Sequence, residues 1–134
     1  MSLPKVWLCE TDLGSVLQAA ADLLRRRALA VVISDLLDAP RSIIQGLARL
    51  RHRHCEVLVL HVVDPAELEF PFTNWTLFRD PESPDLRLRL DARQIRQAYL
   101  EALESHLAQI RKGCGSMNID YCLLETRTPF DQAL

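Results

Sequence analysis

The stretch Ala30-Val31-Val32-Ile33-Ser34-Asp35-Leu36-Leu37-Asp38 decides the fold of this chain. A short run rich in β-branched residues ends abruptly in acids, which is typical of a buried parallel strand with a carboxylate at its carboxyl end. In open α/β sheets, ligands bind outside the carboxyl ends of the strands. The stretch therefore predicts both a buried strand and the functional edge of a sheet.

Helices and strands alternate along the rest of the chain. Apolar residues at helical spacing predict a helix opened by Thr11 and Asp12, with Thr11 as N-cap and the arginines 25–27 at its end. Pro40 suits the first turn of a second helix, with Asp38 as its cap. Three strands are expected, at Leu29–Ser34, Glu56–Val63 and Ile119–Glu125. This order predicts an α/β fold, a partial doubly wound parallel sheet with right-handed crossovers.

Residues 64–91 are expected to form an irregular insertion. Within it, Trp75–Arg79 and Leu86–Leu90 have the pattern of two short strands, which predicts an inserted β-hairpin. Asp91 is predicted to cap a long third helix, ended by Gly113 and Gly115. Thr128-Pro129 then predicts the start of a last helix.

The sheet is narrow, and this has consequences for assembly. Three strands are fewer than usual, and the chain starts at a helix cap and ends inside a helix. We therefore expect residues 1–134 to form a single-domain fragment of a larger α/β domain, with residues 1–3 as an expression scar. The strand Leu29–Ser34 would then be an open apolar edge, so we expect a homodimer or higher oligomer, formed by edge pairing or by packing of uncovered helix faces.

Composition is that of one globular domain. Of 134 residues, 49% are hydrophobic and 25% charged, and a net charge of -2 predicts no general attraction to nucleic acid or anionic lipid. No signal peptide and no bilayer-spanning apolar run is found, so we expect a cytoplasmic protein, while an amino-terminal membrane anchor in a longer form stays open. The scattered cysteines are expected to be reduced buried thiols. They are Cys9, Cys55, Cys114 and Cys122.

Polar side chains follow each predicted strand at its carboxyl end. Ser34 and Asp35 follow the first strand, and Thr11 is expected near the same edge. Hydroxyl and carboxylate oxygens suit a hard cation such as Mg²⁺, although acids after strands also cap helices. The other candidates at this edge are Asp64, Glu125 and Thr126.

Several stretches resemble a known family. The most specific is His61-Val62-Val63-Asp64-Pro65-Ala66-Glu67-Leu68-Glu69-Phe70-Pro71-Phe72. The others are Cys9-Glu10-Thr11-Asp12-Leu13, Val32–Asp38, Ala98–Leu103 and Ile119-Asp120-Tyr121. Together they resemble the carboxyl-terminal half of the bacterial "domain of unknown function fifty-eight" proteins, whose core is similar to a von Willebrand factor type A domain.

The resemblance implies a Rossmann-type sheet and a metal-ion-dependent adhesion site holding Mg²⁺. Thr11 matches the loop threonine of that site, and Asp35 matches its late aspartate. The Asp-x-Ser-x-Ser motif of the family is absent, so the site is expected to be incomplete and to bind Mg²⁺ weakly or not at all. The resemblance also implies work beside a MoxR-type AAA+ ATPase, in chaperone-like assembly or maturation of other complexes.

Several other groups of residues are expected to have structural roles. Arg51-His52-Arg53-His54-Cys55 is interpreted as a basic helix end rather than a zinc or nucleic-acid site. His61 and His106 are expected to be buried core histidines. An aromatic set on the insertion is interpreted as a satellite core, with a partner surface as the alternative. It comprises Phe70, Phe72, Trp75 and Phe78.

The function expected from these features is a non-enzymatic protein-interaction domain. The sequence has no glycine-rich phosphate loop and no Gly-x-Ser-x-Gly elbow, so no catalytic residues are assigned. The alternative is a Mg²⁺-dependent phosphoryl-transfer or receiver-type domain with Asp35 as acceptor. Such a domain needs a lysine at the sheet edge, whereas the lysines are Lys5 and Lys112.

Overall fold

The computed structural model describes residues 12–25, 27–72, 75–79 and 87–133, with the backbone alone for 75–79, 87–90, 130 and 133. These residues form two compact units. The first unit contains the described residues up to Val62 together with Gln109–Leu124, and the second contains Val63–Ala108 and the described residues from Glu125 onward.

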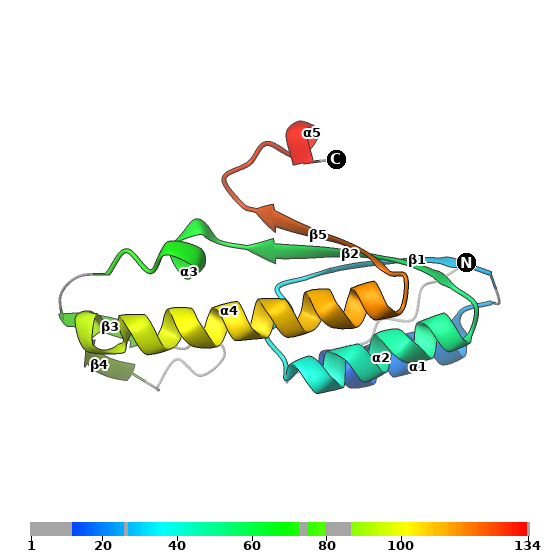
Figure 1. Ribbon diagram of the computed structural model, residues 1–134, viewed down its shortest axis with the longest axis horizontal. Coiled ribbons are helices and arrows are strands. Elements are labelled where there is room, and N and C mark those ends of the chain that lie inside the picture. The colour runs from blue at the N-terminus through cyan, green and yellow to red at the C-terminus, as the bar shows by residue number, and fades with distance from the viewer. Residues whose placement is uncertain (1–11, 26, 73–74, 80–86, 134) are drawn as a thin grey trace. The chain divides into compact units, whose positions relative to one another are not determined.

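A parallel three-stranded sheet organises the first unit. Its strands are β1 (Leu29–Ser34), β2 (Glu56–Val63) and β5 (Asp120–Glu125), in the spatial order β1-β2-β5 (Figure 1). In the β1–β2 pair, Leu29 lies opposite Glu56 and Ser34 opposite His61. The structure confirms the predicted α/β class and the three parallel strands. The runs rich in valine and leucine form the strands β1 and β2.

Helices cover one face of this sheet. They are α1 (Leu13–Leu23), α2 (Pro40–His52) and the carboxyl-terminal part of α4 (Ala92–Ser116), and α1 packs along α2 (Figure 1). Alternate strand residues point into the core, because successive side chains of a strand face opposite sides. The core contains Leu17, Ala21, Val32, Leu36, Ile43, Leu47, Leu50, Cys55, Val57, Val59, Ile110, Cys114 and Ile119.

The opposite side of β1 carries apolar side chains in solvent. Leu29, Val31 and Ile33 are 63%, 47% and 67% exposed. Leu58 and Leu60 of β2 share this face in the register and are half-buried. β1 is therefore apolar on both faces, and in the described part of the chain helices cover one of them.

The end of α4 corrects a prediction. Gly113 and Gly115 do not stop the helix, which continues to Ser116. Gly113 is buried, and a Cβ there would lie 2.6 Å from Cγ1 of Ile44, so glycine permits close packing on α2. The left-handed turn after the helix is made by Asn118 (φ 51°) instead, a residue that tolerates this conformation.

Two predicted caps are also wrong. Asp12 is the N-cap of α1, accepting a hydrogen bond from the backbone of Ser15 at 3.1 Å, whereas Thr11 lies outside the described residues. Asp38 does not cap α2 but accepts from the backbone N–H of Leu13. Its carboxylate therefore ties the loop after β1 to the start of α1. The helix α1 ends at Leu23, before the arginines 25–27, so no basic residue lies in its last turn.

The second unit contains a short helix that sequence patterns do not predict. This helix, α3 (Pro65–Glu69), is capped by Asp64 and closed by Phe70 in the left-handed conformation (φ 43°). Strands β3 (Trp75–Arg79) and β4 (Arg87–Asp91) pair antiparallel, and the residues between them lie outside the described set. The chain continues to α5 (Phe130–Ala133). Among the described residues, no helix combines the length and apolar character needed to cross a bilayer.

Candidate functional site: the loop after β1

The loop that follows β1 holds Asp35 in a fixed backbone conformation. The backbone N–H of Leu36 donates to Oγ of Ser34 at 3.1 Å, which closes a tight turn around Asp35. Leu36 adopts a left-handed conformation (φ 52°) that costs free energy in a branched residue, and its side chain is fully buried in the core. Core packing therefore fixes the backbone on either side of Asp35, whose own side chain is exposed.

His61 holds the same loop from inside the sheet. Its Nε2 lies 2.7 Å from the carbonyl oxygen of Asp35, and its Nδ1 lies 2.7 Å from Oη of Tyr121. A carbonyl only accepts, so Nε2 carries a proton, and in the neutral imidazole Nδ1 then accepts from the tyrosine hydroxyl. The expected burial of His61 is confirmed at 2% exposure. Its bond to the Asp35 loop, which joins β1, β2 and β5, was not predicted.

Tyrosine ionisation predicts the alkaline behaviour of the fold. Burial raises the pKa of Tyr121 above its usual 10.0, with Arg111 opposing the shift, and burial likewise raises the pKa of Tyr99. Above about pH 10 the unfolded chain releases these protons more readily than the folded chain, so the two tyrosines lower stability as pH rises through this range and change nothing below it. Burial also raises the pKa of the Cys114 thiol, which adds to the loss in the same direction. Urea titrations from pH 8 to pH 11 should show this loss, and a flat profile would contradict it.

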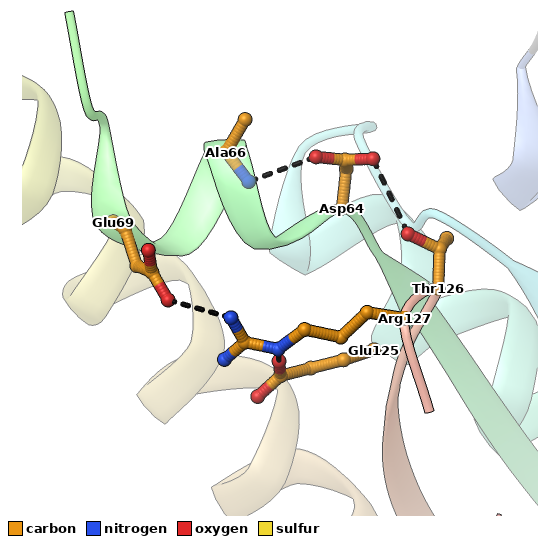
Figure 2. Close-up of polar contacts among 6 residues, drawn as sticks. All are labelled: Asp64, Ala66, Glu69, Glu125, Thr126 and Arg127. Atoms are coloured by element: carbon orange, nitrogen blue, oxygen red, sulfur yellow. Dashed lines mark hydrogen bonds and ion pairs between the residues drawn. The ribbon is translucent and has the colours of Figure 1, made fainter. Parts of the chain in front are cut away.

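Asp64, at the start of the second unit, makes two side-chain hydrogen bonds. Figure 2 shows Asp64, whose Oδ1 accepts from the backbone N–H of Ala66 at 2.8 Å and whose Oδ2 accepts from Oγ1 of Thr126 at 3.2 Å. The backbone N–H of Thr126 also donates to the Val63 carbonyl at 2.9 Å. Asp64 therefore starts α3 and anchors the chain that follows β5.

Arg127 lies between two further carboxylates (Figure 2). Its guanidinium is 3.0 Å from Glu69 and 2.8 Å from Glu125, and these partners raise its pKa, Glu69 most strongly. The Arg127 and Glu69 side chains are more than half exposed, so this pair contributes little stability. One guanidinium carries a single positive charge, so Arg127 offsets only part of the negative charge of Glu69 and Glu125.

The expected Mg²⁺ ligands lie only partly within the described residues. No group of three or more His, Cys, Asp or Glu residues within the described ranges could hold a metal ion. Asp35 offers one carboxylate beside the Ser34 hydroxyl, and Thr11 lies outside the described residues. Cys55 and Cys114 are buried free thiols and Cys122 is a half-buried one, while Cys9 is not described.

Phe70, one residue of the aromatic set of the insertion, packs against two other rings. This ring is buried and packs on Phe72 at a centroid distance of 5.1 Å and on Tyr99 at 4.6 Å. Arg96 donates to the carbonyls of Glu69 (3.0 Å) and Phe70 (3.3 Å), which fixes the end of α3. The side chains of Trp75 and Phe78 lie outside the described set.

The basic residues at the end of α2 serve the fold. Arg51 donates to the carbonyls of Met117 (3.0 Å) and Cys55 (2.8 Å), and basic side chains occupy the last turn of the helix. His52 and His54 are exposed, and His106 is half-buried. The interpretation of residues 51–55 as a basic helix end thus has a direct structural counterpart.

Comparisons with known proteins agree with the resemblance in the sequence. Uncharacterized proteins of Mycobacterium bovis and Mycobacterium tuberculosis are 32% identical over 123 residues, 90% of this chain and 37% of theirs. An uncharacterized Mycobacterium avium protein is 33% identical over 109 residues, 78% of this chain and 63% of its own. The chain thus spans little more than a third of the first of these relatives. No solved structure matches. The family described as "Protein of unknown function DUF58" matches residues 4–109, and the chain belongs to this family.

Proposed function

We propose that this chain is a non-enzymatic protein-interaction domain of a von Willebrand factor A-like protein. Its proposed partner is a MoxR-type AAA+ ATPase, and its proposed task is chaperone-like assembly or maturation of other complexes. The motifs around Asp35 and His61 carry the family resemblance behind this proposal. Membership of the DUF58 family is consistent with it.

The observation that carries the proposal is the fixed presentation of Asp35 beside exposed apolar side chains. The Asp35 carboxylate is exposed, whereas its backbone is held by Ser34, by the buried Leu36 and by His61. Leu37 follows directly and is 73% exposed. A charged and an apolar group on a rigid backbone lose little conformational freedom when a partner binds. Such a pairing suits recognition of another protein.

The remaining acids favour an interaction role over acid–base chemistry. Asp64 is engaged in capping α3, and Glu69 and Glu125 are paired with Arg127. No part of the proposed contact requires Mg²⁺. The proposed contact is made by the Asp35 carboxylate itself and by Leu37.

Affinity measurements on two aspartate variants test this proposal. Asp35→Ala should weaken binding to a MoxR-type ATPase from the same genome by about tenfold or more, or at least 1.4 kcal/mol. Asp120→Ala is the matched control, because Asp120 is also exposed but lies at the amino end of β5. It should leave the affinity unchanged. Equal affinities for both variants, or no binding by the native chain, would refute the proposal.

A further inference from the structure

A polar groove lies between the helices α1 and α2 of the first unit. Its volume is about 420 Å³, and we call it the α1–α2 groove. Gly46 lies against Leu17, and further along both helices Arg49 pairs with Asp22, so the helices run side by side in the same direction. The groove is lined by Gln18 of α1 and by Gln45, Ala48, Arg49 and His52 of α2.

The helical repeat of α2 sets the length of the α1–α2 groove. The four lining residues of α2 are spaced i, i+3, i+4 and i+7, so they share one side of the helix. With a rise of 1.5 Å per residue, this row is about 10 Å long. An extended peptide advances about 3.3 Å per residue, so the row matches about three peptide residues. Ala48, in the middle of the row, contributes only a methyl group and leaves room for a ligand.

Arg49 gives the α1–α2 groove a positive charge and several hydrogen-bond donors. A guanidinium has five N–H donors, and in the described part of the chain only Nη2 of Arg49 forms a hydrogen bond, to Oδ1 of Asp22 at 3.0 Å. None of the five described lining residues is acidic. A planar guanidinium binds a carboxylate with two parallel hydrogen bonds. The groove is therefore complementary to a molecule that carries a carboxylate.

The two glutamines of the groove favour a peptide as the carrier of that carboxylate. Gln18 and Gln45 are exposed, and each carboxamide has both donors and an acceptor. A peptide backbone likewise offers an N–H and a C=O at each residue, whereas the oxygens of an ionised phosphate only accept. The net charge of -2 also gives the chain no general attraction to nucleic acid. Two carboxamides beside one guanidinium therefore match an acidic peptide better than a phosphate.

We propose that the α1–α2 groove binds an acidic segment of another protein. A carboxylate of the segment pairs with Arg49, and its backbone forms hydrogen bonds with Gln18 and Gln45. The side chains of Arg49 and Asp22 are 53% and 60% exposed, so their ion pair contributes little stability and can be exchanged for a pair with the ligand. None of these residues belongs to the loop after β1. The inference therefore does not depend on the proposed recognition of an ATPase.

Peptide titrations followed by NMR test the chemistry of the ligand. The probe is the capped peptide Ala-Glu-Glu-Glu-Ala, and its uncharged control is Ala-Gln-Gln-Gln-Ala. In the isotope-labelled full chain, the glutamate peptide should shift the side-chain amide signals of Gln18 and Gln45. It should bind about tenfold more tightly than the glutamine peptide, since only the former can pair with Arg49. Equal affinities would overturn the proposal. Displacement of the glutamate peptide by an equal concentration of inorganic phosphate would also overturn it, because the groove would then select any anion.

Two substitutions with opposite expected effects test the role of Arg49. Arg49→Gln should weaken binding of the glutamate peptide by about fivefold or more. Asp22→Asn should tighten it about twofold, because this variant removes the carboxylate that competes for the guanidinium, and a misfolded variant would not gain affinity.

Arg41→Gln is the matched control for these variants. Arg41 is also an exposed arginine of α2, but it lies in the first turn and does not line the groove. Its variant should bind the glutamate peptide as the native chain does. Equal losses in Arg41→Gln and Arg49→Gln would indicate general charge attraction and overturn the proposal. Weaker binding by Asp22→Asn would contradict the exchange of partners at Arg49.

Discussion

Leu36→Ala is expected to lower the free energy of unfolding by about 2–5 kcal/mol, the usual effect of truncating a buried leucine. Leu37→Ala should change it by less than about 0.5 kcal/mol. The two leucines are neighbours, but Leu36 is 0% exposed within the core and Leu37 is 73% exposed. The left-handed backbone at Leu36 is retained in the alanine variant, so the loss reports the packing of this one side chain.

Urea denaturation of both variants provides the measurement. Leu36 anchors the loop that presents Asp35, so Leu36→Ala should weaken both the stability of the fold and binding to the proposed partner. Leu37→Ala should weaken binding alone. Similar unfolding midpoints for the two variants would show that Leu36 does not hold the loop in the core.

Gly113→Ala is expected to destabilise the protein by about 1–2 kcal/mol, although alanine ordinarily favours a helix over glycine by about 1 kcal/mol. The new Cβ would lie 2.6 Å and 2.7 Å from Cγ1 and Cδ1 of Ile44. Ile44 is a β-branched residue within α2, and such residues have one strongly preferred rotamer in a helix, so it has little freedom to move away.

Gly115→Ala is the control for this prediction, because the two glycines occupy the same helix. No atom lies within 4 Å of a Cβ at position 115, so this variant should gain up to about 1 kcal/mol from helix propensity alone. Thermal melts of both variants should therefore shift in opposite directions. A stabilised Gly113→Ala variant would mean that the packing of α4 on α2 is looser than described.

Regular elements were predictable where local chemistry and tertiary packing agree. The predicted bounds of β1 and β2 match the structure, because apolar runs rich in valine and leucine end at polar residues in both. Pro40 likewise marks the start of α2. The helix α3 was missed because five residues starting with Pro65 carry no periodicity to detect. Its formation depends on the Asp64 cap and on Phe70 closing it.

Predictions failed where a residue serves a distant neighbour. In the sequence, Gly113 resembles a helix stop. In the structure, its lack of a side chain lets α4 pack closely on Ile44, which lies 69 positions earlier in the chain. Asp38 resembles a cap for the helix that follows it, but its carboxylate reaches back to Leu13. Val57, Val59 and His61 are two residues apart along β2 and share one face of the strand, and this spacing indicates that His61 is buried. Its hydrogen bonds depend on the register of three strands, which no local pattern contains.

The bond between His61 and the Asp35 carbonyl has a consequence for motion. Surface loops usually open by themselves, with a free energy far below that of unfolding the whole domain. Here the loop backbone is attached to an imidazole in the core, and the adjoining Leu36 side chain is part of that core. The amide hydrogen of Leu36 should therefore exchange with solvent only when the sheet itself opens. The segment proposed to face a partner is therefore expected to belong to the slowest-exchanging cooperative unit of the fold.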